Sequence, residues 1–222
     1  ILHDQFHASV PEVIAHNTEL NCFLMKDAGK PLREILKQQF NTKLLCEAID
    51  QFTSMQLSVA DHVNVFLDIG VPDWRLDKLP DLYKQLLSQK DILIADGLSE
   101  TEISTLDRLL PTISKLCKKL SSYSIKQTIG QCDFHDNNIL IAGTSEAITF
   151  IDLGEVVISH PFFSSVSCLR QIKKHHALTD TDDRSFQIVD ACLKKHIRFE
   201  SKANLLDAFE TAHTLWFVYG LL

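Results

Sequence analysis

The segment from residue 131 to residue 155 constrains this chain more than any other part of its sequence. It contains a polar cluster, Asp133-Phe134-His135-Asp136-Asn137-Asn138, which leads directly into an apolar run at 139–142. A turn-like stretch at 143–146 separates that run from another apolar run at 148–153. Two short apolar runs joined by a tight turn predict a β-hairpin. The polar cluster therefore lies at the open end of a predicted hairpin.

The open end of this hairpin carries oxygen-bearing side chains. Asp133 and Asn138 are five residues apart on the loop before the first strand, and Asp152 ends the second strand. The hairpin returns Asp152 to Asn138, so the three side chains converge at one rim. Phosphoryl transfer needs such a set, because a carboxylate must orient the attacking hydroxyl and oxygen ligands must hold Mg²⁺ on the phosphates. We expect Asp133 to orient the hydroxyl, and Asn138 and Asp152 to bind the metal.

A purely structural role is the alternative for these residues. Aspartate, asparagine and histidine are common in turns, where their side chains hydrogen-bond to the local backbone. The joint spacing of Asp133 and Asn138, together with Ile151-Asp152 on the returning strand, favours the kinase-like site.

Short strands precede this segment. Apolar runs at 10–15 and 22–25, with a polar turn between them, predict a first hairpin, and Asp27-Ala28-Gly29 ends its second strand. Pro31 suits the first turn of a helix. From there to Tyr123, apolar residues recur at spacings of three and four, which predicts amphipathic helices.

Local signals refine the helical part of the chain. Ser99-x-x-Glu102 is a capping box that opens a helix, which we expect to continue to Leu120 with a kink at Pro111. Helical periodicity returns near Pro161 and lasts to the end of the sequence. Strands followed by many helices around one inserted hairpin indicate an α+β fold rather than an alternating parallel sheet.

The pattern D-x-H-x-x-N-x-L at 133–140, followed by I-D at 151–152, resembles the signature of the aminoglycoside phosphotransferase and choline kinase superfamily. Phe23-Leu24-Met25-Lys26-Asp27-Ala28-Gly29 resembles the last small-lobe strand and the hinge of these enzymes. Pro31-Leu32-Arg33-Glu34 resembles the start of the helix that follows the hinge. The resemblance runs from residue 10 to residue 170, and its specific part is the segment 131–155.

The resemblance implies a protein-kinase-like fold in two parts. Residues 1–29 would be the end of a small β lobe and its hinge, and residues 30–222 would form a mostly helical large lobe. That lobe would carry the catalytic loop at 131–140 and the metal-binding segment at 151–155. The implied reaction uses ATP and Mg²⁺ to phosphorylate a hydroxyl of a small molecule, such as an amino sugar, a sugar or an amino alcohol.

The resemblance also assigns individual residues to the site. The implied catalytic set is Asp133, His135 and Asn138, with His135 bracing the loop. The implied metal ligands are Asn138 and Asp152. The backbone of the hinge would hydrogen-bond adenine, and two apolar side chains would pack beneath it. The implied nucleotide contacts are Met25, Lys26, Ala28, Leu140 and Ile151.

Two departures from the family pattern support a different interpretation. The family usually has His-Gly before the catalytic aspartate, whereas this chain has Gln131-Cys132. Nothing upstream of the hinge supplies a phosphate-covering loop or its lysine, so we expect the chain to be truncated. The alternative is a pseudokinase, which keeps the fold and serves as a binding or regulatory module.

Composition narrows the possible partners. The formal net charge of −7 argues against binding to nucleic acid, which needs a basic surface. No apolar run approaches the roughly 18 residues of a membrane span, so we expect no membrane insertion. The 6 cysteines include no C-x-x-C pair, which favours reduced thiols in a cytoplasmic protein.

Three other groups of residues have both a structural and a functional interpretation. His175-His176 suggests metal binding, but no further ligand has suitable spacing, so we predict a solvated helix end. Ser164-Ser165 lacks a G-x-S-x-G context, so we predict helix-start residues rather than a nucleophile. Trp216, Phe217 and Tyr219 are either core residues or the wall of an acceptor pocket, and core packing is the default.

Overall fold

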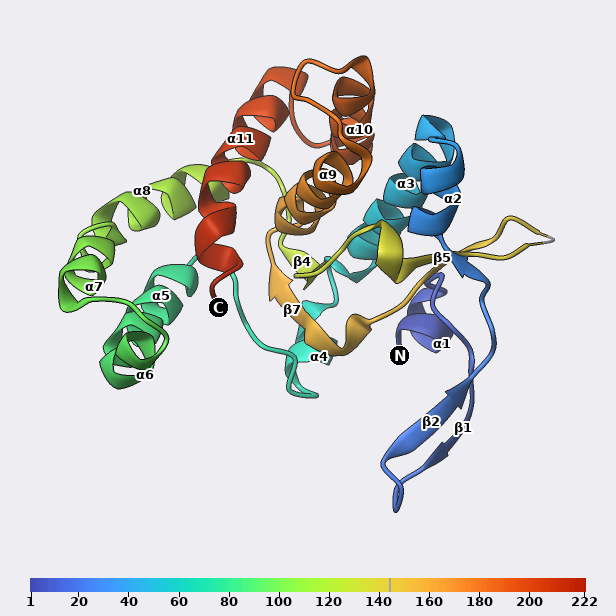
Figure 1. Cartoon of the computed structure of the whole chain (residues 1–222), viewed down its shortest axis with the longest axis horizontal. Helices are drawn as coiled ribbons and strands as arrows, with labels where there is room; N and C mark the ends of the chain where they lie inside the picture. The colour runs from blue at the N-terminus through green and yellow to red at the C-terminus, as the bar shows by residue number, and fades with distance from the viewer. Residues whose placement is uncertain (144) are drawn as a thin grey trace.

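The computed structural model describes residues 1–143 and 145–222, and Figure 1 shows small antiparallel sheets among many helices. The arrangement is α+β, as the sequence predicts. The turn predicted at 143–146 includes Thr144, which lies outside the described residues. The elements in chain order are α1 (Leu2–Phe6), β1 (Val13–Asn17), β2 (Cys22–Met25), β3 (Lys30–Pro31), α2 (Leu32–Gln38), α3 (Thr42–Val59), α4 (Val63–Leu67), α5 (Leu79–Ser88), α6 (Lys90–Ala95), α7 (Glu100–Asp107), α8 (Leu110–Ser121), β4 (Thr128–Gln131), the 3₁₀ helix η1 (Asp136–Asn138), β5 (Ile139–Ile141), β6 (Ile148–Phe150), the 3₁₀ helix η2 (Leu153–Glu155), β7 (Val156–Ser159), α9 (Phe162–His176), α10 (Asp183–Lys194) and α11 (Lys202–Tyr219).

The strands form separate antiparallel sheets. β1 pairs with β2 in the predicted first hairpin, and β5 pairs with β6 in the predicted second one. β3 joins the second hairpin at its β5 edge. β4 pairs with β7, with Gln131 opposite Val156. The sequence patterns do not predict β7, which is short and follows the polar segment at 151–155.

The pairing of β4 with β7 determines where the two polar segments lie. Residues 132–138 lead from β4 to β5, and residues 151–155 lead from β6 back to β7. Both segments therefore connect the same two sheets and run beside each other. A backbone hydrogen bond of 3.0 Å from the Ile151 N–H to the Asn138 carbonyl joins them.

Gly29 fixes the hinge segment to the second hairpin. In the β3–β5 ladder, Lys30 is opposite Ile141 and Pro31 is opposite Leu140. Gly29 has a φ of +106°, and a Cβ at this position would lie 2.1 Å from the carbonyl oxygen of Ile141. Glycine is therefore required both by the positive φ and by the close approach of the two backbones.

The helical stretch after Ser99 differs from its prediction. The capping box is present, since Ser99 Oγ accepts from the Glu102 N–H and the Glu102 carboxylate accepts from the Ser99 N–H. However, α7 ends at Asp107 and α8 begins at Leu110, so two helices replace one kinked helix. Pro111 lies in the first turn of α8, where its missing N–H costs nothing. The proline therefore starts a helix instead of bending one.

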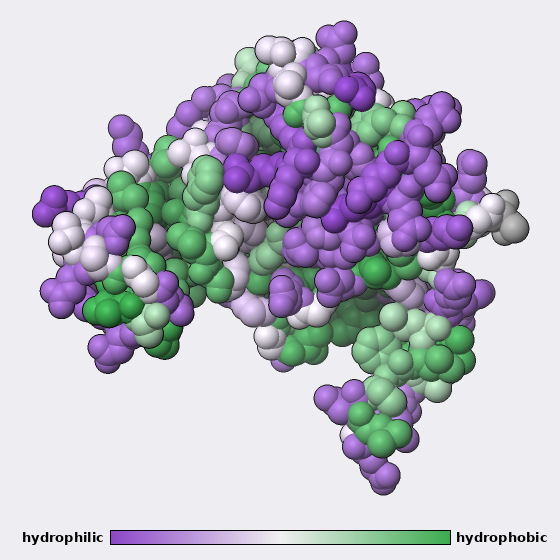
Figure 2. Space-filling view, in the orientation of Figure 1, coloured by the Kyte–Doolittle hydropathy of each residue, from purple (hydrophilic) through white to green (hydrophobic). Residues whose placement is uncertain are grey.

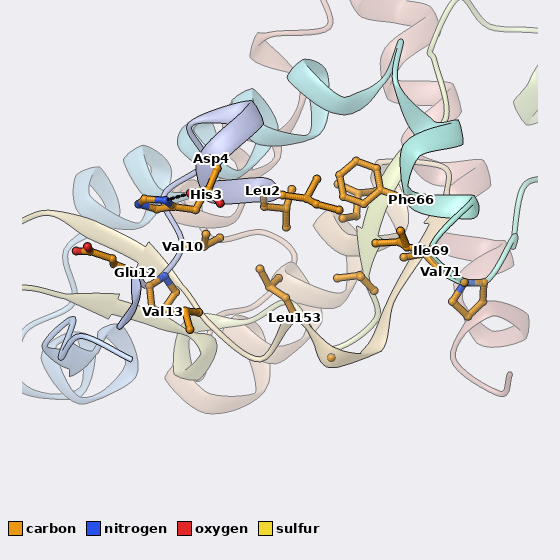
Figure 3. A pocket seen from close by; sticks show the side chains of 17 residues that line it. Leu2, His3, Asp4, Val10, Glu12, Val13, Phe66, Ile69, Val71 and Leu153 are labelled. Atoms are coloured by element: carbon orange, nitrogen blue, oxygen red, sulfur yellow. Dashed lines mark hydrogen bonds and ion pairs between the residues drawn. The ribbon is translucent and has the colours of Figure 1, made fainter. Parts of the chain in front are cut away.

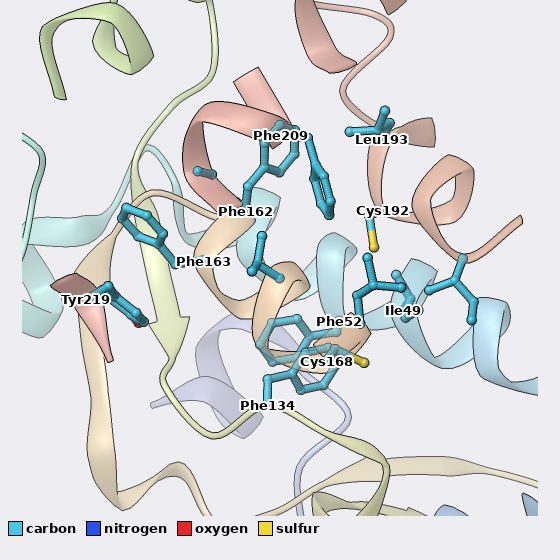
Figure 4. Close-up of a cluster of buried hydrophobic side chains, with 14 of the residues drawn as sticks. Ile49, Phe52, Phe134, Phe162, Phe163, Cys168, Cys192, Leu193, Phe209 and Tyr219 are labelled. Carbon is cyan, nitrogen blue, oxygen red and sulfur yellow. The ribbon is translucent and has the colours of Figure 1, made fainter. Parts of the chain in front are cut away.

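An aromatic core connects the loop at 132–138 to the surrounding helices (Figure 4). Phe134, which is 1% exposed, stacks on Phe52 of α3 with 3.7 Å between ring centroids. Phe163 of α9 stacks on Tyr219 of α11 at 4.5 Å. Because the Phe134 ring is enclosed in this core, the loop that carries it has a fixed position.

The first hairpin has very different surroundings. β1 and β2 extend away from the helices, and every residue of both strands is exposed (Figure 1). Figure 2 shows apolar side chains on the hairpin and around its base. Leu20 at its tip is 74% exposed, and Phe23 is 61% exposed. Exposed apolar residues in this number are unusual for a surface that faces only water.

In the described ranges, the helices are too short or too polar to cross a membrane, and the thiols are unpaired. None of the helices within 1–143 and 145–222 has the length and apolar content that crossing a bilayer demands. All 6 cysteines are free. Burial raises the pKa of Cys117 and of Cys192 to about 12, so neither thiol is a ready nucleophile at neutral pH.

Candidate active site

The structure brings Asp133, Asn138 and Asp152 together at one rim, as the sequence predicts. Asn138 Nδ2 donates to the backbone carbonyl of Asp133 at 3.0 Å and makes a longer hydrogen bond of 3.4 Å to Oδ2 of Asp152. Asn138 itself is only 6% exposed, whereas both aspartates are exposed. A buried amide thus holds two solvent-facing acids at fixed positions on adjacent segments.

His135 orients the first of these acids. Its Nε2 lies 3.1 Å from Oδ2 of Asp133, and its Nδ1 accepts the N–H of Asn137 at 3.2 Å. Since Nδ1 is an acceptor, the neutral ring carries its proton on Nε2 and donates it to the carboxylate. The His135 side chain is 9% exposed and that of Asp133 is 54% exposed. The histidine is therefore a buried support for a carboxylate that solvent can reach.

Asp152 has a left-handed backbone conformation, with φ 60° and ψ 47°. This conformation is costly for most residues, although aspartate tolerates it better than alanine. Gln131 stabilises it, because its Nε2 donates to the carbonyls of Ile151 at 3.1 Å and Asp152 at 2.7 Å. The backbone N–H of Gln131 in turn donates to Ser164 Oγ at 2.9 Å. Gln131 therefore fixes the backbone of Asp152.

The residues around Cys132 belong to the core. The Cys132 thiol donates to the Tyr219 hydroxyl at 3.4 Å, and burial raises the pKa of this thiol. Tyr219 is 1% exposed, so the core interpretation holds for it. Trp216 is half-buried and also packs against the core, whereas Phe217 is 56% exposed, so the core interpretation is wrong for Phe217. The Arg170 guanidinium carbon lies 4.4 Å from the centroid of the Trp216 ring and 4.7 Å from that of Phe217. A cation of the protein already covers one face of each of these two rings.

The residues expected to contact a nucleotide lie beside the hinge. The Lys26 N–H donates to the Glu12 carbonyl at 2.9 Å, which leaves the Lys26 carbonyl as its available backbone group. In the second hairpin, Ile139 and Phe150 are fully buried, whereas Leu140 and Ile151 are half-buried. Because side chains alternate along a strand, Leu140 and Ile151 point away from the core and form part of an open apolar surface. Met25 is exposed and Ala28 half-buried at the adjoining hinge.

The oxygen ligands at this rim fit a magnesium ion. Both hydrogen bonds of Asn138 use Nδ2, so its Oδ1 remains free, and Asp152 presents an exposed carboxylate. Mg²⁺ prefers such oxygen ligands and usually keeps water and phosphate oxygens as well. Across residues 1–143 and 145–222, no cluster of three histidine, cysteine, aspartate or glutamate residues could hold a metal alone. The rim therefore offers two oxygen ligands that suit Mg²⁺, one from Asn138 and one from Asp152.

A cavity of about 660 Å³ begins just past Asp152 (Figure 3). Leu153 lines it together with Leu2 of α1, Phe66 of α4 and Val71. A hydrogen-bonded His3–Asp4 pair lies at its edge. The cavity is mostly apolar and does not include Asp133 or Asn138, so it adjoins the rim without being part of it.

The sequence patterns assign no role to Asp136 and the wrong surroundings to His176. The prediction of a solvated helix end is wrong for His176, whose side chain is 4% exposed and whose Nε2 lies 2.7 Å from Asp136 Oδ2. The Arg33 guanidinium approaches the other carboxylate oxygen at 2.8 Å. These contacts span 40 and 103 residues of sequence, so no local pattern signals them. The physical reason is that α9 packs against the loop at 132–138, so that its last residue, His176, contacts η1.

Sequence comparison finds no family model and no curated protein that matches this chain. Comparison of the fold finds solved small-molecule kinases. An ethanolamine kinase from Plasmodium vivax has a TM-score of 0.66 and 13% identity, over 96% of this chain and 61% of that one. An aminoglycoside phosphotransferase from Streptomyces rimosus, in complex with ADP and streptomycin, has a TM-score of 0.54 and 13% identity, over 96% and 75%. A choline/ethanolamine kinase family protein from Mesorhizobium loti has a TM-score of 0.54 and 13% identity, over 96% and 65%.

These similarities confirm the expected resemblance at the level of the fold. The chain has the protein-kinase-like α+β fold of aminoglycoside phosphotransferases and choline or ethanolamine kinases. It spans 61% of the length of the ethanolamine kinase. An identity of 13% carries no information about the substrate, so the chemistry must be argued from the rim itself.

Proposed function

We propose that this protein is a phosphotransferase that uses ATP and Mg²⁺ to phosphorylate a hydroxyl of a small molecule. One observation carries the proposal: the buried Asn138 amide bridges the Asp133 carbonyl and the Asp152 carboxylate, at 3.0 and 3.4 Å. With Asp133 as the proton acceptor and Asn138 and Asp152 as oxygen ligands, this arrangement would supply the groups that the reaction needs on two neighbouring segments. Phosphoryl transfer requires this combination, because its catalysis is mostly positioning and charge stabilisation.

Asp133 would orient the acceptor hydroxyl and receive its proton. Its carboxylate is 54% exposed, so an acceptor can reach it, and His135 holds one oxygen at 3.1 Å. The second oxygen, Oδ1, is then left for the acceptor. A carboxylate held in this way contributes to rate through proximity and orientation.

Asn138 Oδ1 and the Asp152 carboxylate would be the metal ligands. When bound there, Mg²⁺ would neutralise charge on the transferring phosphoryl group. Gln131 would keep the Asp152 carboxylate at the rim, because its two bonds hold the left-handed backbone of that residue. Gln131, which stands where the family usually has histidine, would therefore still support the backbone of Asp152.

The nucleotide would lie on the open surface beside the hinge. The Lys26 carbonyl and the Ala28 N–H would hydrogen-bond adenine, next to Met25. Leu140 of β5 and Ile151, the residue directly after β6, would pack beneath the ring, since both are half-buried next to fully buried neighbours. The acceptor would approach from the opposite side of the loop, where α9 and α11 lie.

The structural neighbours suggest which acceptors to screen. Ethanolamine kinase and a streptomycin-bound phosphotransferase share this fold, so amino alcohols, amino sugars and sugars form the first screening panel. Arg170 covers Trp216 and Phe217, so these rings do not offer both faces to an ammonium group. Recognition of an amine would have to use the exposed acids at the rim instead.

Calorimetric titration of ATP into the full-length protein, with and without Mg²⁺, tests the proposal. We expect metal-dependent binding that Asp152→Asn weakens at least ~10-fold, because the variant loses a charged ligand. Asp133→Asn should leave this binding within about 2-fold yet lower the turnover of an acceptor from the panel by ~100-fold or more. Asp68→Asn, at the exposed C-terminal end of α4, is the matched control and should change neither. Binding that needs no metal, without any turnover, would favour the pseudokinase alternative.

A further inference from the structure

Asp136 is a buried acid in the middle of the catalytic loop. It is the first residue of the single-turn helix η1, between Asp133 and Asn138, and it is 0% exposed. A buried carboxylate is strongly unfavourable unless other groups neutralise it and hydrogen-bond to both oxygens. A stable fold therefore requires partners for both oxygens of Asp136.

Both oxygens of Asp136 have partners from distant elements. Oδ1 accepts from Arg33 Nε at 2.8 Å, and Arg33 Nη2 lies 2.8 Å from the same oxygen. Oδ2 lies 2.7 Å from His176 Nε2, which donates when the proton is on that nitrogen. The Arg33 and His176 side chains are 15% and 4% exposed. One carboxylate therefore joins three elements in a nearly dry environment.

The three elements come from different sides of the rim. Arg33 lies in the first turn of α2, directly after the β3 strand that pairs with the second hairpin. His176 is the last residue of α9, whose first turn supplies Ser164 to Gln131. Thus α9 contacts the loop at both ends, and α2 anchors it from the hinge side. The Asp136 carboxylate contacts both α2 and α9, so it links both helices to the loop.

We propose that the Arg33–Asp136–His176 network positions Asn138 and Asp133 for phosphoryl transfer. None of the three network residues needs to touch a substrate, and the inference rests on the function proposed above. The connection is short, because Asn138 is two residues from Asp136 and its N–H donates to the His135 carbonyl at 3.0 Å. A shift of the Asp136 anchor therefore moves the Asn138 amide relative to Asp152. Displacements of about 1 Å in such groups can cost ~100-fold in rate.

Stability alone does not explain a network of this kind. Apolar residues of similar volume in place of a buried ion pair often leave stability equal or higher. What apolar residues lack is direction: the guanidinium and the imidazole fix both oxygens of the carboxylate in space. The network is therefore suited to setting the geometry of the loop.

The test compares two substitutions of His176 in the full-length protein. His176→Leu removes the donor and keeps the volume, whereas His176→Gln keeps an N–H donor. We expect His176→Leu to lower kcat at least ~10-fold while the Kd of Mg·ATP changes less than about 2-fold, and His176→Gln to restore most of kcat. Amide hydrogen exchange at residues 133–139 should be faster in the leucine variant than in the glutamine variant. Exchange in α8, which lies far from the network, should be equal in the two.

The possible outcomes separate this inference from the proposed function. An active wild type whose His176→Leu variant has the same kcat, measured well below its melting temperature, would overturn the positioning role even if the variant were less stable. Equal exchange rates at 133–139 in both variants would overturn it as well, and this measurement needs no ligand. A wild type that neither binds Mg·ATP nor turns over any acceptor would refute the proposed function instead.

Discussion

Two hairpins of this protein have similar apolar sequences and opposite surroundings. In β1–β2 every residue is exposed, whereas in β5–β6 buried and half-buried residues alternate. β5–β6 has β3 at one edge and carries its buried side chains into the aromatic core. β1–β2 pairs only with itself among the described residues. The apolar side chains compared are Val13, Ile14, Phe23, Leu24 and Met25 in the first hairpin and Ile139, Ile141, Ile148 and Phe150 in the second.

The difference shows that apolar content predicts a strand without predicting what covers it. Along the second hairpin, side chains alternate between a buried inner face and a half-buried outer face. The outer face adjoins the candidate site. The first hairpin has apolar residues on both faces, so no single layer of protein could cover all of them. A surface of this kind is typical of a contact region.

Paired phenylalanine truncations test this comparison with the largest expected effect. Phe150→Ala should lower the free energy of unfolding by about 3–5 kcal/mol, because it opens a cavity beside Phe52 and Phe134. Phe23→Ala, in the exposed hairpin, should change it by less than about 0.5 kcal/mol. Urea denaturation of both variants measures the two values. Similar losses in the two variants would show that the first hairpin is as well packed as the second.

Paired glycine substitutions sharpen the comparison at the junction between the hairpins. Gly29 and Gly70 both have positive φ, +106° and +91°, but only Gly29 lies against another backbone. Gly70→Ala should cost about 1 kcal/mol for its conformation alone. Gly29→Ala should cost at least about 2 kcal/mol, because its Cβ would also displace Ile141. If thermal denaturation gave equal losses, the contact between the hinge and β5 would be looser than the structure indicates.

A smaller effect should appear in the pH dependence of stability. Burial lowers the pKa of His160 to about 3 and that of His196 to about 4, and His196 makes no hydrogen bond within the described part of the chain. The unfolded chain therefore binds protons below its ordinary histidine pKa of 6.5, where the folded protein does not. Stability should fall by about 1.4 kcal/mol per pH unit for each histidine as the pH drops from 6.5 toward 4.

The His196→Leu variant isolates one of these two contributions. Leucine has a similar volume and binds no proton, so the variant should lose about 1.4 kcal/mol less per pH unit than the wild type below pH 6.5. Urea denaturation at pH 7, 6 and 5 measures the slope. An unchanged slope would mean that water reaches His196 in the folded state. The result would describe the helical core around Phe162, which His196 contacts, and not the exposed β1–β2 hairpin.

The sequence predicts much of this molecule wherever a signal is local. Both hairpins, the capping box at Ser99 and the convergence of Asp133, Asn138 and Asp152 follow from spacings within about twenty residues. Predictions fail where distant segments decide the outcome. β7 is a strand because β4 lies beside it, and α8 is separate from α7 because the chain turns at residues 108–109.

In the candidate site, too, local residues could be predicted from the sequence and distant partners could not. The residues at the rim belong to one continuous segment, so their order along the chain indicates their arrangement. Two of the supports do not belong to that segment: Arg33 and His176 reach Asp136 from α2 and α9. Gln131 does belong to it, and its Nε2 bonds the Asp152 carbonyl 21 residues further along the chain. Sequence alone could name Gln131 as a departure, but only the structure shows which carbonyls it bonds.

The left-handed backbone of Asp152 has a consequence for how this protein can evolve. Asparagine and glycine adopt that conformation at least as easily as aspartate, and both codons are one nucleotide away. Drift to either residue would therefore meet little resistance from folding. The hydrogen bond that Asp152 Oδ2 accepts from Asn138 at 3.4 Å could equally be accepted by the amide oxygen of asparagine. Retention of aspartate over asparagine among natural variants of the gene would therefore record selection on the charge of the carboxylate.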